Sequence, residues 1–223
     1  PVVAKQKLSR QAVNLSDTLH AEYAAELARL LVFDTFKDQT YTRGLNVYTT
    51  IRSKDQQAAW ETVQKHLIDY DRRYGFRGPT QKVDISNPAT KTRVIRTVLE
   101  ETPASPNLLP AVVLEADKNA IRVTIDAVNT LTLDKESLIF AGLRPKQKGR
   151  RLPKIPEAHK LFPGSVVRVS KTDKNQWTLA QPPEVQAGFI SADFQTGAVR
   201  SLVGGFDFYL NMFNHVTQAV RQP

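Results

Sequence analysis

Apolar residues recur at helical spacing in two stretches of the first third of the chain. The first stretch, residues 21–37, has its apolar stripe at Ala24, Leu27, Ala28, Leu31 and Val32. The second, residues 54–73, has its stripe at Ala59, Trp60, Val63 and Leu67. Both patterns predict amphipathic helices. Ser53, followed three residues later by Gln56, predicts a capping box worth about 1 kcal/mol at the start of the second helix.

Alternation of apolar and polar positions marks the strands. "GLNVYTTI", residues 44–51, alternates in this way and predicts a half-buried strand. Residues 107–181 hold five or so short runs and no convincing helix: "LLPAVVLEA", "NAIRVTIDA", "TLTLD" with "SLIFA", "SVVRVSK" and "QWTLAQ". This strand count favours a five-stranded Greek-key barrel of the OB type over a sandwich. We expect its interior to contain Val112, Leu114, Ile121, Val123, Val167, Val169 and Leu179.

A further pair of alternating runs follows "QPPE". Residues 185–205 alternate on both sides of Gln195, Thr196 and Gly197, which predicts a β-hairpin. A hairpin without covering elements is only marginally stable, and few residues follow it. We therefore expect the chain to have been cut inside a domain, and the start at Pro1 without Met suggests a cut there as well.

These patterns predict an α+β chain of several domains. We expect helical and strand linker elements in residues 1–79, an OB-like small β-barrel in residues 80–181, and the first hairpin of a further domain in residues 182–223. With 223 residues, 41% of them hydrophobic, the chain is long enough to bury at least one core. The absence of cysteine excludes disulfides, thiolate metal sites and a Cys nucleophile.

Charge changes the picture. Lys and Arg number 31 against 22 Asp and Glu, so the formal charge of +9 favours an anionic partner. The densest cationic stretch is "RPKQKGRRLPKIPEAHK", residues 144–160, hereafter the basic loop. Its candidate polyanion-facing residues are Arg144, Lys146, Lys148, Arg150, Arg151 and Lys154, with Lys160 at its end. A loop that is merely solvated remains the alternative.

Nucleic-acid binding by this loop is not favoured. Single-strand binding by OB folds needs exposed aromatic side chains on which bases stack. Phe162 is the only aromatic residue between Gly142 and Ser170, and Trp177 shares a face with Leu179. We therefore expect attraction to a polyanion without the reading of a base sequence.

The sequence contains no group of residues with the spacing of a catalytic, metal or cofactor site. The histidines, His20, His66, His159 and His215, have no metal-ligand spacing. Glu100 and Glu101 are adjacent, and neighbours in an extended stretch point to opposite faces. Gly204 and Gly205 fit a tight turn better than a phosphate loop. We expect no catalytic residue, metal or cofactor in this chain.

Three segments resemble class A penicillin-binding proteins, of the 1A subtype of Gram-negative bacteria. They are "YTRGLNVYTTIRSKDQQAAWETVQKHLIDYDRRYGFRGP", "QPPEVQAGFISADFQTGAVRSLVGGFDF" and "FNHVTQAVRQP". The resemblance implies a bifunctional peptidoglycan synthase, with glycosyltransferase and D,D-transpeptidase activities, that β-lactams inhibit. It implies that the hairpin opens an α/β transpeptidase domain. It further implies a membrane-anchored parent at the periplasmic face of the inner membrane, acting on peptidoglycan and its lipid-linked precursor, with periplasmic regulators as partners.

The family's acylation motif, S-x-x-K, is absent from these residues. In the family it follows an "RQPGS-FKP" stretch, and here Arg221, Gln222 and Pro223 match only its first letters. We therefore expect this piece to be a soluble, non-catalytic scaffold of an enzyme. The alternative is a free-standing OB-type module that binds an anionic polymer or nucleic acid, for which the hairpin would have no use.

Overall fold

The chain forms two compact units. The computed structural model describes residues 19–220 except residues 106, 150 and 152–153. Of the described residues, the first unit contains those up to Val63, Gly188–Phe208 and those from Met212 to Val220, and the second contains those of Gln64–Ala187 and Tyr209–Asn211. Helix α2, Ser53–Arg72, is divided between the two units: its residues up to Val63 belong to the first unit, and those from Gln64 onward belong to the second.

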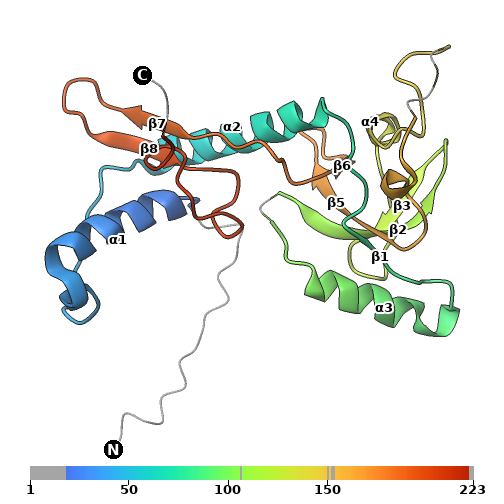
Figure 1. Ribbon diagram of the computed structural model, residues 1–223, viewed down its shortest axis with the longest axis horizontal. Helices are drawn as coiled ribbons and strands as arrows, with labels where there is room; N and C mark the ends of the chain where they lie inside the picture. Colours follow the sequence, from blue (N-terminus) through green and yellow to red (C-terminus); the bar gives the residue numbers. More distant parts are fainter. Residues whose placement is uncertain (1–18, 106, 150, 152–153, 221–223) are drawn as a thin grey trace, which may run out of the picture. The chain divides into compact units, whose positions relative to one another are not determined.

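The first unit is built on helix α1 and one β-hairpin. Helix α1, Glu22–Phe36, confirms the first predicted helix and is followed by a 3-10 turn, η2, Lys37–Tyr41. Strands β7, Phe189–Ala192, and β8, Val199–Val203, pair antiparallel and confirm the predicted hairpin. Figure 1 shows α1 beside β8, and their shared core is made of Tyr23, Ala24 and Leu202 with Leu27, Ile51, Val199, Phe208 and Val216 packed around them.

Asp193 organises the hairpin turn. Its carboxylate accepts hydrogen bonds from the backbone of Thr196 and Gln195, at 3.0 and 3.1 Å, and from the Thr196 hydroxyl at 2.9 Å. The backbone and hydroxyl bonds from Thr196, with Arg200 as a further donor, lower the pKa of Asp193 to about 2. The charged form is thus the one that the turn stabilises.

The strand predicted for residues 44–51 is wrong. Residues 44–50 are exposed and belong to no strand, and Ile51 alone is half-buried. Among the described residues this segment meets β8 only near its end, where the Thr50 hydroxyl donates to the Val199 carbonyl at 2.7 Å and the Arg52 N–H donates to the Arg200 carbonyl at 2.9 Å. Alternation without a ladder of backbone partners does not make a strand.

Helix α2 confirms the second predicted helix and buries the predicted stripe of Ala59, Trp60, Val63 and Leu67. The predicted capping box is wrong. Gln56 is fully buried, and its amide bonds both the N–H and the carbonyl of Leu202, at 2.8 and 3.0 Å, and the carbonyl of His20 at 2.6 Å. The Gln56 side chain therefore bonds the backbone of β8 and not that of the helix start. Because the side chain is buried, its amide oxygen and its amide NH₂ group both need hydrogen-bond partners.

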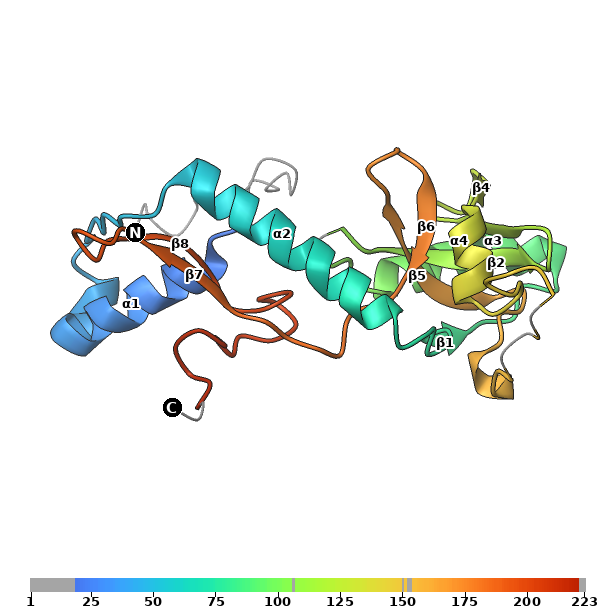
Figure 2. The same cartoon turned by 90° about the horizontal axis from the view of Figure 1, so that it is seen from above.

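The second unit is an antiparallel sheet with one helix on each face. Its strands are β1, Gln81–Lys82; β2, Leu109–Ala116; β3, Ile121–Thr124; β4, Leu131–Thr132; β5, Ser165–Lys171; and β6, Trp177–Ala180. The pairing order is β1-β5-β2-β3-β4, and β6 also pairs with β5. Figure 2 shows β6 beside β5. Among the described strands this path closes no ring, so the sheet is OB-like without the expected closed barrel.

Two helices cover this sheet, and neither was predicted. Helix α3, Pro88–Glu101, packs Ile95 and Val98 against Val112 and Val166. Helix α4, Lys135–Phe140, packs Leu138 into the other core cluster. Figure 1 shows α3 and α4 on opposite sides of the sheet. "SLIFA" was predicted as a strand, but the Asp134 carboxylate caps α4 by accepting the Ser137 N–H at 2.8 Å.

The predicted interior positions are confirmed as buried except Leu114, which is half-buried. They belong to two cores and not to one barrel interior. Val112 and Leu114 face α3, whereas Val123, Val167 and Leu179 lie in the cluster on the side of α4. Alternate residues of a strand point to opposite faces, so a sheet covered on both sides buries both sets.

Candidate functional site

The basic loop connects α4 to β5 and is held at both ends. At its start the N–H groups of Leu143 and Arg144 donate to the Leu138 carbonyl, at 2.8 and 3.1 Å, and Arg144 Nε donates to the Lys118 carbonyl. At its end a 3-10 turn, η3, Glu157–His159, leads into the buried Leu161. The loop is therefore a surface excursion with fixed ends.

Gly78 shows how closely the end of the loop packs. It has a φ of +96°, and a Cβ at this position would lie 2.8 Å from the Cα of His159. Only glycine accepts both this backbone conformation and this approach without strain. The segment at Gly78 thus fixes η3 against the body of the second unit.

Besides Lys160, four described cations of the loop are exposed: Lys146, Lys148, Arg151 and Lys154. Within the described part of the chain none of the four has an ion pair or a side-chain hydrogen bond. Two predicted members have structural contacts instead, since Arg144 is half-buried against Lys118 and Lys160 pairs with Glu157 at 2.5 Å. Arg150 lies outside the described residues.

The charge of the second unit is concentrated in this loop. Residues 144–160 carry seven Lys and Arg and one Glu, which gives a net charge of +6. Residues 76–185, which include the loop, carry 18 Lys and Arg against 11 Asp and Glu, which gives +7. The rest of this region is therefore almost neutral in net charge.

The nearby aromatic rings are already in contact with cations. Lys82 Nζ lies 4.6 Å from the centre of the Phe162 ring, and Lys171 Nζ lies 5.1 Å from that of Trp177. Trp177 also packs against the core on the α4 side of the sheet. Both arrangements are cation–π contacts. Each of these two rings therefore has a lysine ammonium group near it.

The other sequence candidates remain apart. His20 stacks on Trp60 with ring centres 3.6 Å apart, and His215 contacts Phe213. Glu100 and Glu101 lie exposed at the end of α3, in a helix and not in the extended stretch that was expected. Over the described residues, no three His, Asp or Glu side chains come close enough to hold a metal ion.

The Ser137 hydroxyl of the second unit has several hydrogen-bond partners, and its role is structural. Its Oγ donates to the Asp134 carboxylate at 2.6 Å and accepts the Leu179 N–H at 2.7 Å. It is fully buried. A hydroxyl without access to solvent has no route to a substrate. The hydrogen bonds of Ser137 to Asp134 and Leu179 therefore hold α4 to β6, and Ser137 is not a nucleophile.

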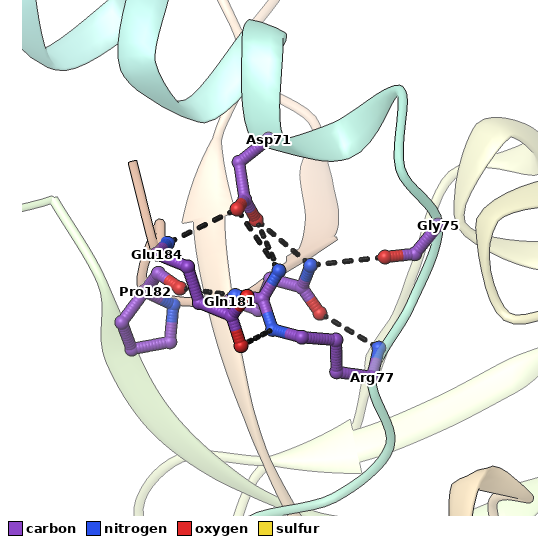
Figure 3. Close-up of polar contacts among 6 residues, drawn as sticks. All are labelled: Asp71, Gly75, Arg77, Gln181, Pro182 and Glu184. Atoms are coloured by element: carbon purple, nitrogen blue, oxygen red, sulfur yellow. Dashed lines mark hydrogen bonds and ion pairs between the residues drawn. The ribbon is translucent and has the colours of Figure 1, made fainter. Parts of the chain in front are cut away.

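A second polar centre, the Asp71 cluster, was missed in the sequence. It consists of Asp71, Gly75, Arg77, Gln181, Pro182 and Glu184, shown in Figure 3. The Asp71 side chain is only 4% exposed. Both carboxylate oxygens accept from Arg77 Nη1 at 2.9 Å, and one also accepts from Gln181 Nε2 at 2.8 Å and the other from the Glu184 N–H at 3.1 Å.

The partners of Asp71 are also bonded to one another. Gln181 accepts the Arg77 N–H at 3.0 Å and donates to the Gly75 carbonyl at 3.1 Å. Arg77 donates to the Pro182 carbonyl at 2.6 Å and pairs with the Glu184 carboxylate at 3.1 Å. The cluster thus joins the segment that leads into the sheet to the segment that leaves it. Several donors together satisfy the buried charge of Asp71.

Arg72, the next residue of α2, adds a contact to the same region. Its guanidinium donates to the Leu179 carbonyl at 3.0 Å and lies 4.6 Å over the Phe140 ring. Burial lowers the pKa of Arg72, and the charges of Asp134 and Glu136 partly oppose this shift. The end of α2 is therefore fixed to β6 and α4 within the second unit.

Comparison with known proteins shows which proteins this chain is similar to. Residues 76–185 match the penicillin-binding protein OB-like domain. Over 91% of its length the chain is 34% identical to penicillin-binding protein 1A of Neisseria flavescens and 35% identical to that of Escherichia coli. The chain is homologous to part of penicillin-binding protein 1A. It spans about a quarter of these relatives, 25% and 24% of their lengths.

A crystal structure of penicillin-binding protein 1A from Haemophilus influenzae has a similar fold. It superposes with a TM-score of 0.73 at 28% identity, over 91% of this chain and 28% of that one. Within this penicillin-binding protein 1A homologue the OB-like match contains the whole basic loop and every member of the Asp71 cluster except Asp71 and Gly75. None of the described helices is long and apolar enough to span a membrane.

Proposed function

We propose that this chain is part of a bifunctional peptidoglycan synthase. The observation that carries this proposal is the 34–35% identity to penicillin-binding protein 1A over 91% of the chain, on both sides of the OB-like match. The longer protein would polymerise a lipid-linked disaccharide and crosslink peptide stems through a serine acyl-enzyme. It would do so at the periplasmic face of the inner membrane, with periplasmic regulators as partners.

Within that protein the chain has a scaffold role. Residues 1–79 are proposed as an interdomain linker with the helices that precede the transpeptidase, residues 80–181 as the OB-like insert, and residues 182–223 as the start of the transpeptidase domain. The proposal is supported by the sheet with its two helices and by the hairpin β7–β8. Without a serine nucleophile and its base, no acyl-enzyme forms in this part.

The alternative is a free-standing OB-type module for an anionic polymer or nucleic acid. The elements outside the OB-like match speak against it. Helix α1 and strands β7 and β8 form a core of their own around Tyr23, Ala24 and Leu202. A binding module needs only the sheet of the second unit, whereas a synthase needs both.

Labelling with a fluorescent penicillin tests the proposed function. The 223-residue chain contains no S-x-x-K and should remain unlabelled, whereas a longer protein that continues from it through the motif should be labelled stoichiometrically. Preincubation with unlabelled penicillin is the control and should prevent the signal. Hydroxylamine should release it, because an acyl-serine is an ester.

Two results would contradict this account. Stoichiometric, hydroxylamine-sensitive labelling of the 223-residue chain would place the nucleophile inside it. A folded longer protein that contains S-x-x-K and takes no label would remove the transpeptidase from the proposal.

A further inference from the structure

One turn of the chain after β8 is closed by its own side chains. The Asn214 Oδ1 accepts the Val216 N–H at 3.0 Å. The Asn214 carbonyl accepts the N–H groups of Thr217 and Gln218, at 3.2 and 2.8 Å. In return the Gln218 Oε1 accepts the Asn214 N–H at 2.7 Å. This reciprocal pattern is similar to a capping box, in which two side chains satisfy free N–H groups at the start of a helical turn. We call residues 214–218 the Asn214 turn.

The Asn214 turn is fixed against the end of β8 and against α1. The His215 N–H donates to the Gly204 carbonyl at 2.9 Å. A Cβ at Gly204 would lie 2.5 Å from Tyr23 Cδ1 and 2.7 Å from Asn214 Oδ1, so two buried side chains approach this backbone at once. Packing as close as this leaves the turn little room to shift.

Val216 holds the middle of the Asn214 turn. Its side chain packs against the buried core that α1 and β8 share. A Cβ at Gly188, directly before β7, would lie 2.9 Å from Val216 Cγ2. Val220, just beyond the turn, is fully exposed. The contacts of the turn, and not those of Val220, therefore fix the direction in which the chain leaves the hairpin.

We propose that Asn214 and Gln218 are positioning residues for the acylation reaction, because the turn that they close directs the chain towards its serine nucleophile. This inference rests on the proposed function, in which the longer protein continues from this chain through the S-x-x-K motif. A serine reacts only when its oxygen is held in reach of its base and of the carbonyl carbon. Such geometry must be held to within about 0.5 Å, and the Asn214 turn gives the backbone before the serine a fixed point.

A purely structural role of the Asn214 turn is the competing explanation. The turn would then only stabilise the core of the first unit. The bond of Gln218 favours positioning, because this side chain is exposed and its Oε1 restrains the backbone at Asn214. An exposed side chain exchanges a bond to water for a bond to protein, so the net contribution of this bond to the free energy of unfolding is small.

The rate of acylation of the longer protein by a fluorescent penicillin tests this inference. In this reaction the serine oxygen bonds the lactam carbonyl carbon, the lactam C–N bond breaks, and the serine proton passes to the nitrogen. The test variants are Asn214→Ala and Gln218→Ala. The control is Thr217→Ala, at an exposed residue of the same turn. Asn214→Asp keeps an acceptor for the Val216 N–H and is the conservative variant.

Asn214→Ala and Gln218→Ala should each lower the second-order rate constant of acylation roughly tenfold, because a misplaced nucleophile reacts slowly. The final amount of label per folded protein should equal that of the unaltered protein. Thr217→Ala and Asn214→Asp should change the rate constant by less than about threefold, since both keep the cap. Circular dichroism and the thermal midpoint measure how much of each variant is folded.

Four outcomes would overturn the inference. The first two are an unchanged rate constant in folded Asn214→Ala or in Gln218→Ala, and equal slowing by Thr217→Ala. The others are slowing by Asn214→Ala that Asn214→Asp does not reverse, and a lower midpoint and labelled fraction without slower labelling of the folded protein, which is what a structural role predicts.

The same assay separates this inference from the proposed function. If Asn214→Ala does not fold, Gln218→Ala decides alone, because its side chain is exposed. An unaltered longer protein that takes no label would refute the proposed function. A labelled longer protein whose rate is indifferent to Asn214 and Gln218 would refute this inference alone.

Discussion

Asp71 is the buried carboxylate of the Asp71 cluster, which joins the segment that leads into the OB-like sheet to the segment that leaves it. Its carboxylate is buried and accepts hydrogen bonds from Arg77, Gln181 and the backbone of Glu184. A buried charge of this kind is costly unless all its partners are in place. The contacts therefore stabilise the junction of the two chain segments.

Replacing Asp71 with Asn should open this junction. The charge that Arg77 faces disappears, and one acceptor oxygen becomes a donor, so we expect the free energy of unfolding to fall by about 1 to 3 kcal/mol. Hydrogen–deuterium exchange of the 223-residue chain should show faster exchange at the Arg77 and Glu184 amides. Asp69→Asn, an exposed carboxylate of the same helix, is the control. Equal effects of the two substitutions would refute a special role for Asp71.

The sequence gives little indication of this cluster, for a physical reason. Gln181 lies 110 residues from Asp71, and no local periodicity links them. Gln56 shows the same limit, because its spacing from Ser53 matches a capping box while its amide bonds Leu202 across the fold. Cations are different: the exposure of Lys146 and Lys148 follows from their composition and proline-rich neighbourhood alone.

At the scale of elements, strands with a covered face were predictable and isolated ones were not. β5, Ser165–Lys171, agrees with its predicted run because β2 pairs with it along one edge and both its faces are covered. Apolar and polar residues alternate equally well in residues 44–51, but this segment forms no ladder of backbone hydrogen bonds with a neighbouring strand. Helix α3 did have a local indication, since Asn87 caps it and Pro88 occupies its first turn.

Substitutions in the sheet test this assignment of elements. Val167→Ala and Ile121→Ala remove methyl groups from fully packed positions, and each should lower the free energy of unfolding by about 1 to 4 kcal/mol. Val128→Ala, at a side chain 74% exposed, is the control and should cost less than about 0.5 kcal/mol.

Urea denaturation followed by tryptophan fluorescence measures this difference. The chain has two tryptophans, and Trp177 reports on the second unit when Trp60 is replaced by Phe in every variant compared. If Val167→Ala and Ile121→Ala left the midpoint where Val128→Ala leaves it, the strands would be assigned wrongly.

At the scale of the molecule, homology and charge describe different properties. The homology to penicillin-binding protein 1A covers 91% of the chain and includes residues of both units, so it concerns the fold of both units. Most of the net positive charge of residues 76–185 lies in the basic loop, so this charge is a local property of one loop.

The most direct test of the central claim is a synthesis assay with the longer protein that contains this chain. The protein is incubated with lipid-linked disaccharide pentapeptide, and the products are digested with a muramidase and separated by chromatography. We predict glycan chains with crosslinked peptide dimers, and loss of the dimers alone when penicillin is added. A folded protein that forms neither glycan chains nor crosslinks under these conditions would contradict the account.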